Sequence, residues 1–417
     1  MSEAIRVLHF ADVHVGMENY GKTDPETGLS SRVVDFLHRM DEMVAYAREN
    51  DVDLVIFAGD AFKTRTPNPT YQREFAWRIR DLADVAPVVM LVGNHDLSPS
   101  VLKASSIEIY DTLAVPNVWV AQEYETRRIR TQRGDVIVGT APYPIRARLM
   151  QDIQHTAGRT IREVDQLLEE TLTGLLTNLA EEADVLAGAE AIPRILTGHF
   201  TVRGAALGSE RQVMLGRDIQ VGLHLLADKR WDYVAMGHIH KHQDLTHNRD
   251  DAPPVVYSGS LERIDFGEES DPKGFCWIEL ERDNTQWEYI RVQARKMLTL
   301  RINCTHESNP TKKVVELIRQ HDLRHAVVRL IIALTPETDA ILNDGAIREA
   351  LRQAGVFHLA GIKRDVQRAD RARLAANPEG MTHEQLLEQY LISREIERER
   401  RNLLIEAARE IMGTPEL

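Results

Sequence analysis

Short apolar runs alternate with amphipathic helical patterns over the first two thirds of the chain, and this alternation restricts the fold more than any other feature. The runs 5–10 (IRVLHF), 53–59 (DLVIFAG) and 87–93 (PVVMLVG) have the length and composition of buried strands. The segments 31–50 and 71–82 between them carry apolar residues at helical spacing. Together they predict β-α-β-α-β, the beginning of a layered α/β fold.

The sequence also predicts the order of the domains. A long helix is expected at 161–184, and further strand patterns follow at 135–143, 194–200, 232–238 and 254–260. We expect a first domain over residues 1–293, and a β-α-β-α pattern predicts a small α/β domain over 294–362. A charged stretch with an Asn-Pro pair predicts a linker at 363–381. Residues 382–417 predict two amphipathic helices with too few apolar residues for a core, which is typical of a partner-binding segment.

Composition excludes some classes of protein and leaves others open. The 417 residues are 43% hydrophobic with a net charge of −13, which argues against a wholly basic coat of the histone kind. A local basic surface for a nucleic acid remains compatible with that charge. The two cysteines, Cys276 and Cys304, form no C-x-x-C pair, which disfavours a zinc knuckle and suits a reducing cytosol. No apolar run approaches the roughly 18 residues of a membrane span, so we expect a soluble, cytoplasmic protein.

Five predicted strands end in metal-ligand residue types. They are followed by Asp12 and His14, by Asp60, by Asn94, His95 and Asp96, by His199, and by His238 and His240. In open α/β sheets, ligands bind at the carboxyl ends of strands. Any one of these residues alone is typical of a solvated loop, but five strand ends with ligand-type residues together indicate a site.

The mixture of carboxylates, one amide and several imidazoles suits Mn²⁺, Fe²⁺ or Zn²⁺. The absence of cysteine disfavours a structural zinc site, and the imidazoles disfavour a pure Mg²⁺ or Ca²⁺ site. There are more ligands than one ion needs. Two ions roughly 3.5–4 Å apart, sharing one carboxylate, would use them, lower the pKa of a bound water and clamp the oxygens of an in-line phosphoryl displacement.

In this order, the segments DVH, GD, GNHD, GH and GHIH resemble the five signatures of calcineurin-like metallophosphoesterases. The segments GDAFKTRTPNP and YSGSLERIDFGE (257–268) resemble the SbcD nuclease subfamily, the bacterial counterpart of the eukaryotic meiotic-recombination nuclease. The resemblance implies a layered β-sandwich flanked by helices, followed by a capping domain and a helical tail.

The resemblance also implies roles for single residues. One metal would be held by Asp12, His14 and His240, the other by Asn94, His199 and His238, with Asp60 bridging both. His95 would face the scissile phosphate with support from Asp96. Lys63 stands where some relatives have histidine, so Lys63, like Arg65 and Arg263, is either a phosphate contact or an ordinary surface residue.

By the same resemblance, the expected activity is that of a two-metal, Mn²⁺-favouring DNA phosphodiesterase. It would act as an exonuclease on double-stranded ends and as an endonuclease on single strands or hairpins. The expected assembly is a homodimer that binds an SbcC-type coiled-coil ATPase through residues 382–417. Helix 31–50 is a candidate dimer surface, although packing in the core explains its apolar stripe equally well. Since the chain has no Walker A motif, any ATP dependence comes from that partner. Two alternatives remain, a phosphatase or phosphodiesterase for a small molecule or protein, and a scaffold subunit with a vestigial metal site.

Overall fold

The computed structural model describes residues 3–98, 103–150, 160–208, 218–249, 251–367, 382–394 and 396–412. The chain divides into two compact units. The large unit comprises residues 1–299, 323–329 and 355–360, and the small unit comprises residues 300–322, 330–354 and 361–417. None of the helices in these described ranges is long and apolar enough to cross a membrane.

Two six-stranded sheets form the centre of the large unit. The first has the order β14-β13-β1-β2-β3-β4, made by Gln286–Arg291, Gly274–Leu280, Ile5–Phe10, Leu54–Phe57, Val88–Leu91 and Val118–Ala121. The second has the order β11-β12-β10-β7-β6-β5, made by Gln243–Asp244, Val255–Tyr257, Tyr233–Gly237, Arg194–His199, Asp135–Ala141 and Glu125–Arg130. Neighbouring strands from β1 to β4, and from β12 through β10 and β7 to β6, are parallel, so their carboxyl ends lie at one edge of each sheet.

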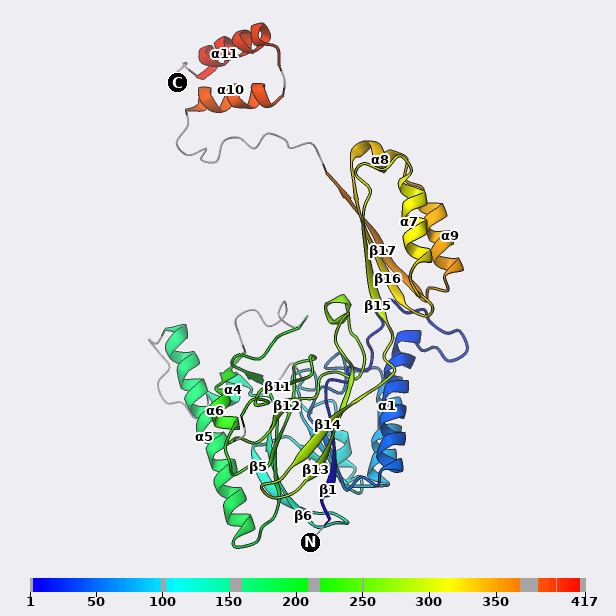
Figure 1. Cartoon of the computed structure of the whole chain (residues 1–417). Helices are drawn as coiled ribbons and strands as arrows, with labels where there is room; N and C mark the ends of the chain where they lie inside the picture. Colours follow the sequence, from blue (N-terminus) through cyan, green and yellow to red (C-terminus); the bar gives the residue numbers. More distant parts are fainter. Residues whose placement is uncertain are drawn as a thin grey trace. The chain divides into compact units, whose positions relative to one another are not determined.

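The central strands are buried on both faces, which explains why they read as continuous apolar runs. On β1, Val7 belongs to the core between the two sheets, whereas Leu8 packs with the helices α1 and α2. On β7, Ile195 faces the first sheet and Leu196 packs toward the long helix α5. Helices thus cover the outer face of each sheet (Figure 1). The predicted layered α/β fold, a sandwich flanked by helices, is confirmed.

The three main helices of the large unit begin at side-chain caps. In α1 (Ser31–Glu49), the Ser30 hydroxyl accepts the N–H of Arg32. In α2 (Pro69–Ala83), Asn68 is the cap and proline occupies the first turn. In α5 (Ile161–Ala187), Thr160 and Glu163 form a capping box. Shorter elements are α3 (Ile109–Thr112), α4 (Arg146–Leu149), β8 (Thr201–Val202), β9 (Gln220–Val221), α6 (Leu223–Leu226) and the 3₁₀ helix η2 (Phe266–Glu268).

The apolar stripe of α1 lies in the core of the large unit. Its members are fully or almost fully buried: Val33, Phe36, Leu37, Met40, Met43, Val44 and Ala47. Helix 31–50 therefore owes its stripe to core packing, and the alternative of a dimer surface on this stripe is dropped.

Three strands, β15 (Met297–Asn303), β16 (Val327–Leu334) and β17 (His358–Val366), form a further sheet, and the division between the units passes through them. Helices α7 (Pro310–Arg319), α8 (Pro336–Ala340) and α9 (Asp344–Gln353) follow its strands. β17 was not predicted and enters the stretch assigned to a linker, because its charged residues hide the strand pattern. Arg364 pairs with Asp339 and Asp344. Residues 368–381 lie outside the described residues.

The end of the chain contains α10 (His383–Ser393) and α11 (Arg398–Met412), which pack against each other. Thr382 caps α10 through a capping box with Gln385, and Glu384 pairs with Arg409 across the two helices. Two helices are thus present where the sequence predicts them. Residues 413–417 lie outside the described part of the chain.

Candidate metal centre

All the predicted strand-end side chains meet at one edge of the sandwich. They lie at the carboxyl ends of β1, β2 and β3 of the first sheet and of β7 and β10 of the second, and most are buried: Asp12, His14, Asp60, Asp96, His199, His238 and His240. Asn94 and His95 are partly exposed. The carboxyl ends of the strands from both sheets therefore enclose one polar site, as expected for parallel strands.

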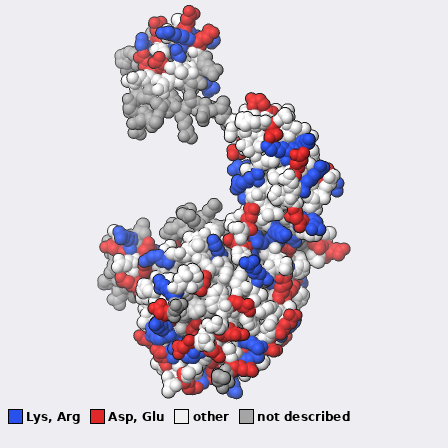
Figure 2. All heavy atoms as spheres, in the orientation of Figure 1, with Lys and Arg blue, Asp and Glu red and all other residues white. Residues whose placement is uncertain are grey.

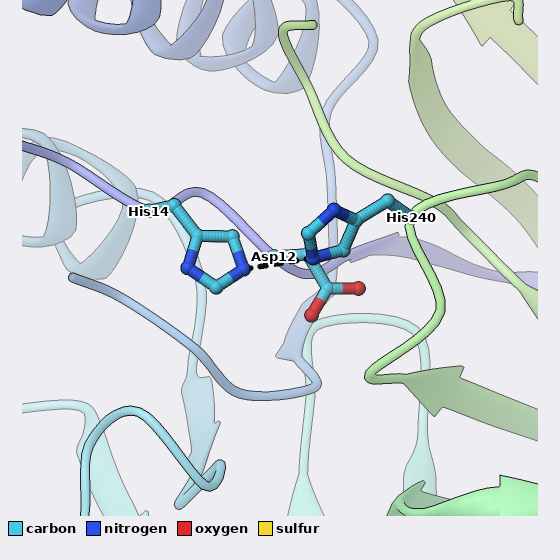
Figure 3. Close-up of side chains that lie close together, drawn as sticks. All are labelled: Asp12, His14 and His240. Carbon is cyan, nitrogen blue, oxygen red and sulfur yellow. Dashed lines mark hydrogen bonds between the residues drawn. The ribbon is translucent and has the colours of Figure 1, made fainter. Parts of the chain in front are cut away.

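Asp12, His14 and His240 form the first set of converging side chains (Figure 3). Their ligand atoms lie within 4.8 Å of one another. The Nε2 atoms of His14 and His240 are only 3.0 Å apart. Burial lowers the pKa of His14 well below its usual value of 6.5, so this imidazole is neutral at physiological pH. Facing imidazole nitrogens beside a carboxylate fit a divalent cation, which needs neutral histidines as ligands.

Asp60 lies between this first set and a second one. Its Oδ2 is 3.6 Å from Nε2 of His14, and its Oδ1 is 3.4 Å from Nε2 of His199. Burial raises the pKa of Asp60, but the charge and the hydrogen bond of the neighbouring His199 outweigh it and hold the pKa well below the usual range. An ionised carboxylate with one oxygen toward each set has the arrangement that a bridging ligand requires.

The second set consists of Asn94, His199 and His238. Oδ1 of Asn94 lies 3.1 Å from Nε2 of His199 and 3.0 Å from Nδ1 of His238. His199 donates from Nδ1 to the Ala58 carbonyl at 2.6 Å, which turns its Nε2 to the site. Burial lowers the pKa of His199, but Asp60 outweighs burial and raises it to about 9. A divalent ion binding here would therefore displace a proton from His199.

Two acidic residues outside these sets fix the ring orientation of His240 and His238. His240 donates from Nδ1 to Oε1 of Glu268 at 2.9 Å, which leaves Nε2 for the site. Glu268 also pairs with Lys273 at 2.8 Å, and both side chains are completely buried. His238 donates from Nε2 to Asp218 at 3.0 Å, which leaves Nδ1 for the site. Carboxylates that accept from the second nitrogen of a metal-binding histidine orient the ring and raise its basicity.

Sequence reasoning missed both of these acidic residues. Glu268 lies in the segment YSGSLERIDFGE, which was used only for the family resemblance, and Asp218 lies in a segment to which the sequence analysis assigned no site residue. No spacing in the chain links Glu268 to His240 or Asp218 to His238. A pairing of this kind is set by the folded arrangement of distant segments.

His95 lies beside the first set. It donates from Nδ1 to the Lys63 carbonyl at 2.8 Å, which leaves Nε2 free of that bond, and its ring meets the His14 ring edge-on at a centroid distance of 4.9 Å. Its backbone N–H donates to Oδ1 of Asp60 at 2.8 Å. The ligand atoms of His14, Asp60 and His95 also lie within 4.8 Å of one another. His95 is therefore placed to contact a group held at the site.

Asp96 has a different place from the one expected. Its carboxylate accepts the backbone N–H groups of Asp60, Ala61 and Gly93 at 2.9 to 3.0 Å, and no hydrogen bond between its carboxylate and the His95 side chain occurs among the described contacts. Burial and the neighbouring Asp60 charge raise the pKa of Asp96 to about 6. Both oxygens of Asp96 are used to hold the turn that carries Asp60, so support of the His95 ring comes from the Lys63 carbonyl instead.

The backbone turns sharply at the strand ends. Four non-glycine residues of the site have positive φ: Asp12 (53°), His14 (49°), Asp60 (63°) and His238 (90°). Such conformations cost about 1–3 kcal/mol each and persist where the surrounding structure enforces them. All four residues lie at one edge of the sandwich. The surrounding structure therefore holds them in strained backbone conformations that bring their side chains together.

Gly93 allows the close approach of the Asp60 carboxylate. A Cβ at position 93 would lie 2.2 Å from Oδ1 of Asp60 and 2.5 Å from its backbone nitrogen. We expect Gly93→Ala to displace Asp60 and to weaken metal binding about tenfold or more, comparable to the loss of a residue that orients a ligand. Titration calorimetry with Mn²⁺ measures this effect. Gly174→Ala is the matched control, because a Cβ at Gly174 meets nothing within 4 Å; equal affinities of the two variants would contradict the expectation.

The three basic residues expected to contact a substrate lie in different settings. The side chains of Lys63 and Arg65 have no hydrogen bond or ion pair with another described residue. Arg263 instead donates to the carbonyls of Glu268, Arg295 and Asp271 at 2.9 to 3.2 Å. Because each of its three nitrogen atoms donates to a carbonyl of the protein, Arg263 has a structural role, and it is no longer proposed as a phosphate contact.

A known protein family matches this geometry. Residues 5–242 match the family described as Calcineurin-like phosphoesterase, and this range contains every residue of the two sets. The chain belongs to the calcineurin-like phosphoesterases. The family predicted from the five motifs is thereby confirmed. With the Asp/His cluster, this membership makes the protein a metal-dependent phosphoester hydrolase.

Among its relatives, this phosphoesterase is 30% identical over 246 residues to the SbcD subunit of the SbcCD nuclease of Escherichia coli (strain K12), covering 57% of each chain. It is 26% identical over 303 residues to the SbcD subunit of the SbcCD nuclease of Bacillus subtilis (strain 168), covering 70% of this chain and 71% of that one. The matched region thus spans 57% of the length of the first relative. A solved dimetal phosphatase from Danio rerio has a TM-score of 0.40 and 12% identity, covering 69% of this chain and 99% of that one, a similarity too low to bear on the reaction.

Proposed function

We propose that this phosphoesterase is a two-metal, Mn²⁺-favouring DNA phosphodiesterase and the nuclease subunit of an SbcC–SbcD-type complex. It would act as an exonuclease on double-stranded ends and as an endonuclease on single-stranded or hairpin DNA, in the cytoplasm, during double-strand break repair and recombination. The observation that carries the proposal is the position of Asp60, whose two carboxylate oxygens face two separate sets of ligand-type side chains. The similarity to relatives named as SbcCD nuclease subunits supports the choice of DNA as the substrate.

The hydrogen bonds of the side chains support the proposed role of each residue. One ion would be held by Asp12, His14 and His240, the other by Asn94, His199 and His238, with Asp60 shared. When bound, two such ions supply Lewis acidity at the phosphoryl oxygens and lower the pKa of a water. Glu268 and Asp218 orient His240 and His238, so that Nε2 of the first and Nδ1 of the second would be available to the ions. His95, with Nδ1 occupied, presents Nε2 to hold or transfer a proton at the leaving oxygen.

The distribution of charged residues restricts where the protein can contact DNA. Lys and Arg side chains are interspersed with Asp and Glu over the face shown in Figure 2, and the whole chain carries a net charge of −13. Contacts with phosphates must therefore be local to the site. Lys63 and Arg65 remain candidates for such contacts, since neither pairs with a described acidic residue.

The experiment that tests the proposed function measures cleavage of a labelled DNA hairpin and of bis(p-nitrophenyl) phosphate by the full chain, with Mn²⁺, with Mg²⁺ and with a chelator. We expect Mn²⁺-dependent cleavage of both substrates. Hydrolysis of the small ester with intact DNA, unchanged by adding an SbcC-type ATPase, would favour a phosphodiesterase for small molecules. Absence of turnover with metal bound and the ATPase present would favour a scaffold subunit.

We place the proposed homodimer contact on α2 and α3. Three large apolar side chains are unusually exposed: Trp77 on α2 (45%), Ile109 on α3 (52%) and Leu113 directly after α3 (68%). They border an apolar cavity of about 420 Å³ between the two helices. Exposed apolar surface of this kind, flanked by arginines, is typical of a protein interface.

If this contact forms the dimer, the double variant Trp77→Glu with Leu113→Glu is expected to be monomeric in analytical ultracentrifugation at concentrations where the unchanged chain is dimeric. Two buried carboxylates in an apolar contact cost several kcal/mol of association free energy. Val185→Glu on α5 is the control, because Val185 is 81% exposed on another helix. A dimer that survives the double substitution would exclude this face.

The proposed binding segment for the ATPase is the pair α10 and α11. It presents apolar side chains at its surface, Tyr390, Ile392, Leu403 and Leu404. We expect Leu403→Glu with Leu404→Glu to abolish co-purification with an SbcC-type coiled-coil ATPase and to leave hydrolysis of bis(p-nitrophenyl) phosphate unchanged. Continued co-purification of this variant would show that the partner binds elsewhere.

A further inference from the structure

A cavity opens beside the metal centre, on the side of the second set. Its volume is about 450 Å³, within the range of small-molecule sites. Tyr143 forms part of its wall, and the Tyr143 ring lies 5.8 Å from the His238 ring and 6.4 Å from the His199 ring, measured between centroids. The Tyr143 hydroxyl donates to Asp218 at 2.8 Å, and Asp218 in turn accepts from His238. The cavity and the metal centre thus share one wall.

The lining of this cavity combines flat and apolar walls with an unsatisfied polar group. The apolar part includes Tyr124, Ile145, Leu149 and Leu175. The Gln122 amide, also in the wall, makes no hydrogen bond to a described side chain or backbone group. Such an amide can bond the polar edge of a flat heterocycle that fills the apolar space.

Basic residues outnumber acidic ones in the lining of this cavity, four to two. Arg148 pairs with Glu123 at 3.0 Å, Arg146 pairs with Asp165, and the Glu108 carboxylate accepts the backbone N–H of Ser105 at 3.1 Å. Arg65 and Lys103 have no ion pair with any residue that the structure describes. An occupant with a flat apolar body, polar edges and a negatively charged attachment satisfies all three features, and a nucleotide has this chemistry.

We propose that this cavity receives one unpaired nucleotide of the DNA strand whose phosphodiester lies at the metal centre. The base enters the cavity against Tyr143 and Tyr124, and Arg65 and Lys103 contact the adjoining phosphate. The inference rests on the proposed nuclease function and extends it to the form of the substrate. A paired base must leave the stack to enter, which costs a few kcal/mol, whereas a frayed end or a hairpin loop already has free bases. The cavity therefore selects unpaired nucleotides next to the cleaved bond.

The first test fills the cavity. In Gln122→Trp the indole occupies the space of the base, while Gln132→Trp, in the exposed turn between β5 and β6, adds the same side chain at a distant surface. We expect kcat/KM for a single-stranded oligonucleotide, divided by kcat/KM for bis(p-nitrophenyl) phosphate, to fall about tenfold or more in Gln122→Trp, the size of one lost base–aromatic stacking interaction. The ratio in Gln132→Trp should equal that of the unchanged chain. Thermal unfolding of both variants verifies that they are folded.

The second test compares two inhibitors of bis(p-nitrophenyl) phosphate hydrolysis. Deoxyadenosine 5′-monophosphate and 2-deoxyribose 5-phosphate carry the same phosphate, and only the first carries a base. We expect the nucleotide to inhibit about tenfold more strongly in the unchanged chain and no more strongly than the sugar phosphate in Gln122→Trp. Equal inhibition by both compounds in the unchanged chain would overturn the proposal.

The salt dependence of DNA binding tests the role of the two basic residues, Arg65 and Lys103. In Arg65→Ala with Lys103→Ala, the slope of log affinity against log salt for a single-stranded oligonucleotide is expected to become shallower by about 1.4, because two phosphate contacts are lost. An unchanged slope would remove these residues from the DNA path.

The failure of this inference is distinguishable from failure of the proposed function. DNA cleavage with an unchanged substrate ratio in Gln122→Trp would overturn the cavity proposal and leave the nuclease intact. Absence of DNA cleavage by the unchanged chain, with the small ester hydrolysed, would instead overturn the nuclease assignment.

Discussion

Asp60→Ala is expected to lose both metal binding and hydrolysis, whereas His95→Ala is expected to lose hydrolysis alone. Asp60 faces both sets of ligand-type side chains, so its removal deprives two ions of a shared ligand. His95 is held by the Lys63 carbonyl with Nε2 free to contact the reacting group. A histidine that transfers a proton in the transition state contributes about 10²–10⁴-fold to the rate, and we expect a loss of that size in kcat. Titration calorimetry with Mn²⁺ and hydrolysis of bis(p-nitrophenyl) phosphate measure the two effects separately.

His247→Ala is the matched control for both variants, because His247 is an exposed histidine in a loop of the same unit. It should bind Mn²⁺ and hydrolyse the ester as the unchanged chain does. The geometry also allows His95 to act as a ligand with His14 and Asp60, since their ligand atoms lie within 4.8 Å. A loss of Mn²⁺ affinity in His95→Ala as large as that in Asp60→Ala would make His95 a ligand and would contradict its role as the residue facing the phosphate.

Glu268→Ala is expected to cause the largest loss of stability. The substitution leaves the Lys273 ammonium buried without its counter-ion, and breaking a buried ion pair from one side costs about 3–5 kcal/mol of unfolding free energy. It also removes the acceptor of the His240 Nδ1–H, so Mn²⁺ affinity should fall about 10–100-fold. Urea unfolding in chelator measures the first effect without any contribution from metal binding. Titration calorimetry measures the second.

The double variant Glu268→Gln with Lys273→Met separates the two effects. It removes both buried charges and keeps a carbonyl acceptor near His240, so we expect it to recover most of the unfolding free energy lost in Glu268→Ala. Mn²⁺ affinity should recover in part, because a neutral amide orients the His240 ring less strongly than a carboxylate. A change in unfolding free energy below about 1 kcal/mol in Glu268→Ala would show that the pair is not a significant source of stability.

Much of the architecture could be predicted from local patterns. The strands at 5–10, 194–200 and 232–238 and the helices at 31–50 and 71–82 occur within a few residues of the expected positions. Buried parallel strands are continuous apolar runs, and amphipathic helices repeat with their own period, so the local sequence carries this information. The strand β17 was not predicted, because lysine, arginine and aspartate in its second half obscure the apolar pattern of a strand.

The sequence by itself determined the family and which residue types stand at the strand ends, because each motif is a short segment with a fixed order along the chain. The tertiary structure decided which of these side chains meet and through which atoms. His14 and His240 are 226 positions apart, and no local feature links them. In the folded chain, Asp96 accepts hydrogen bonds from the turn that carries Asp60, and Arg263 donates to backbone carbonyls. Glu268 accepts from His240 and orients its ring. Each of these contacts joins segments that only the packing of two sheets brings together, so the folded chain alone contains that information.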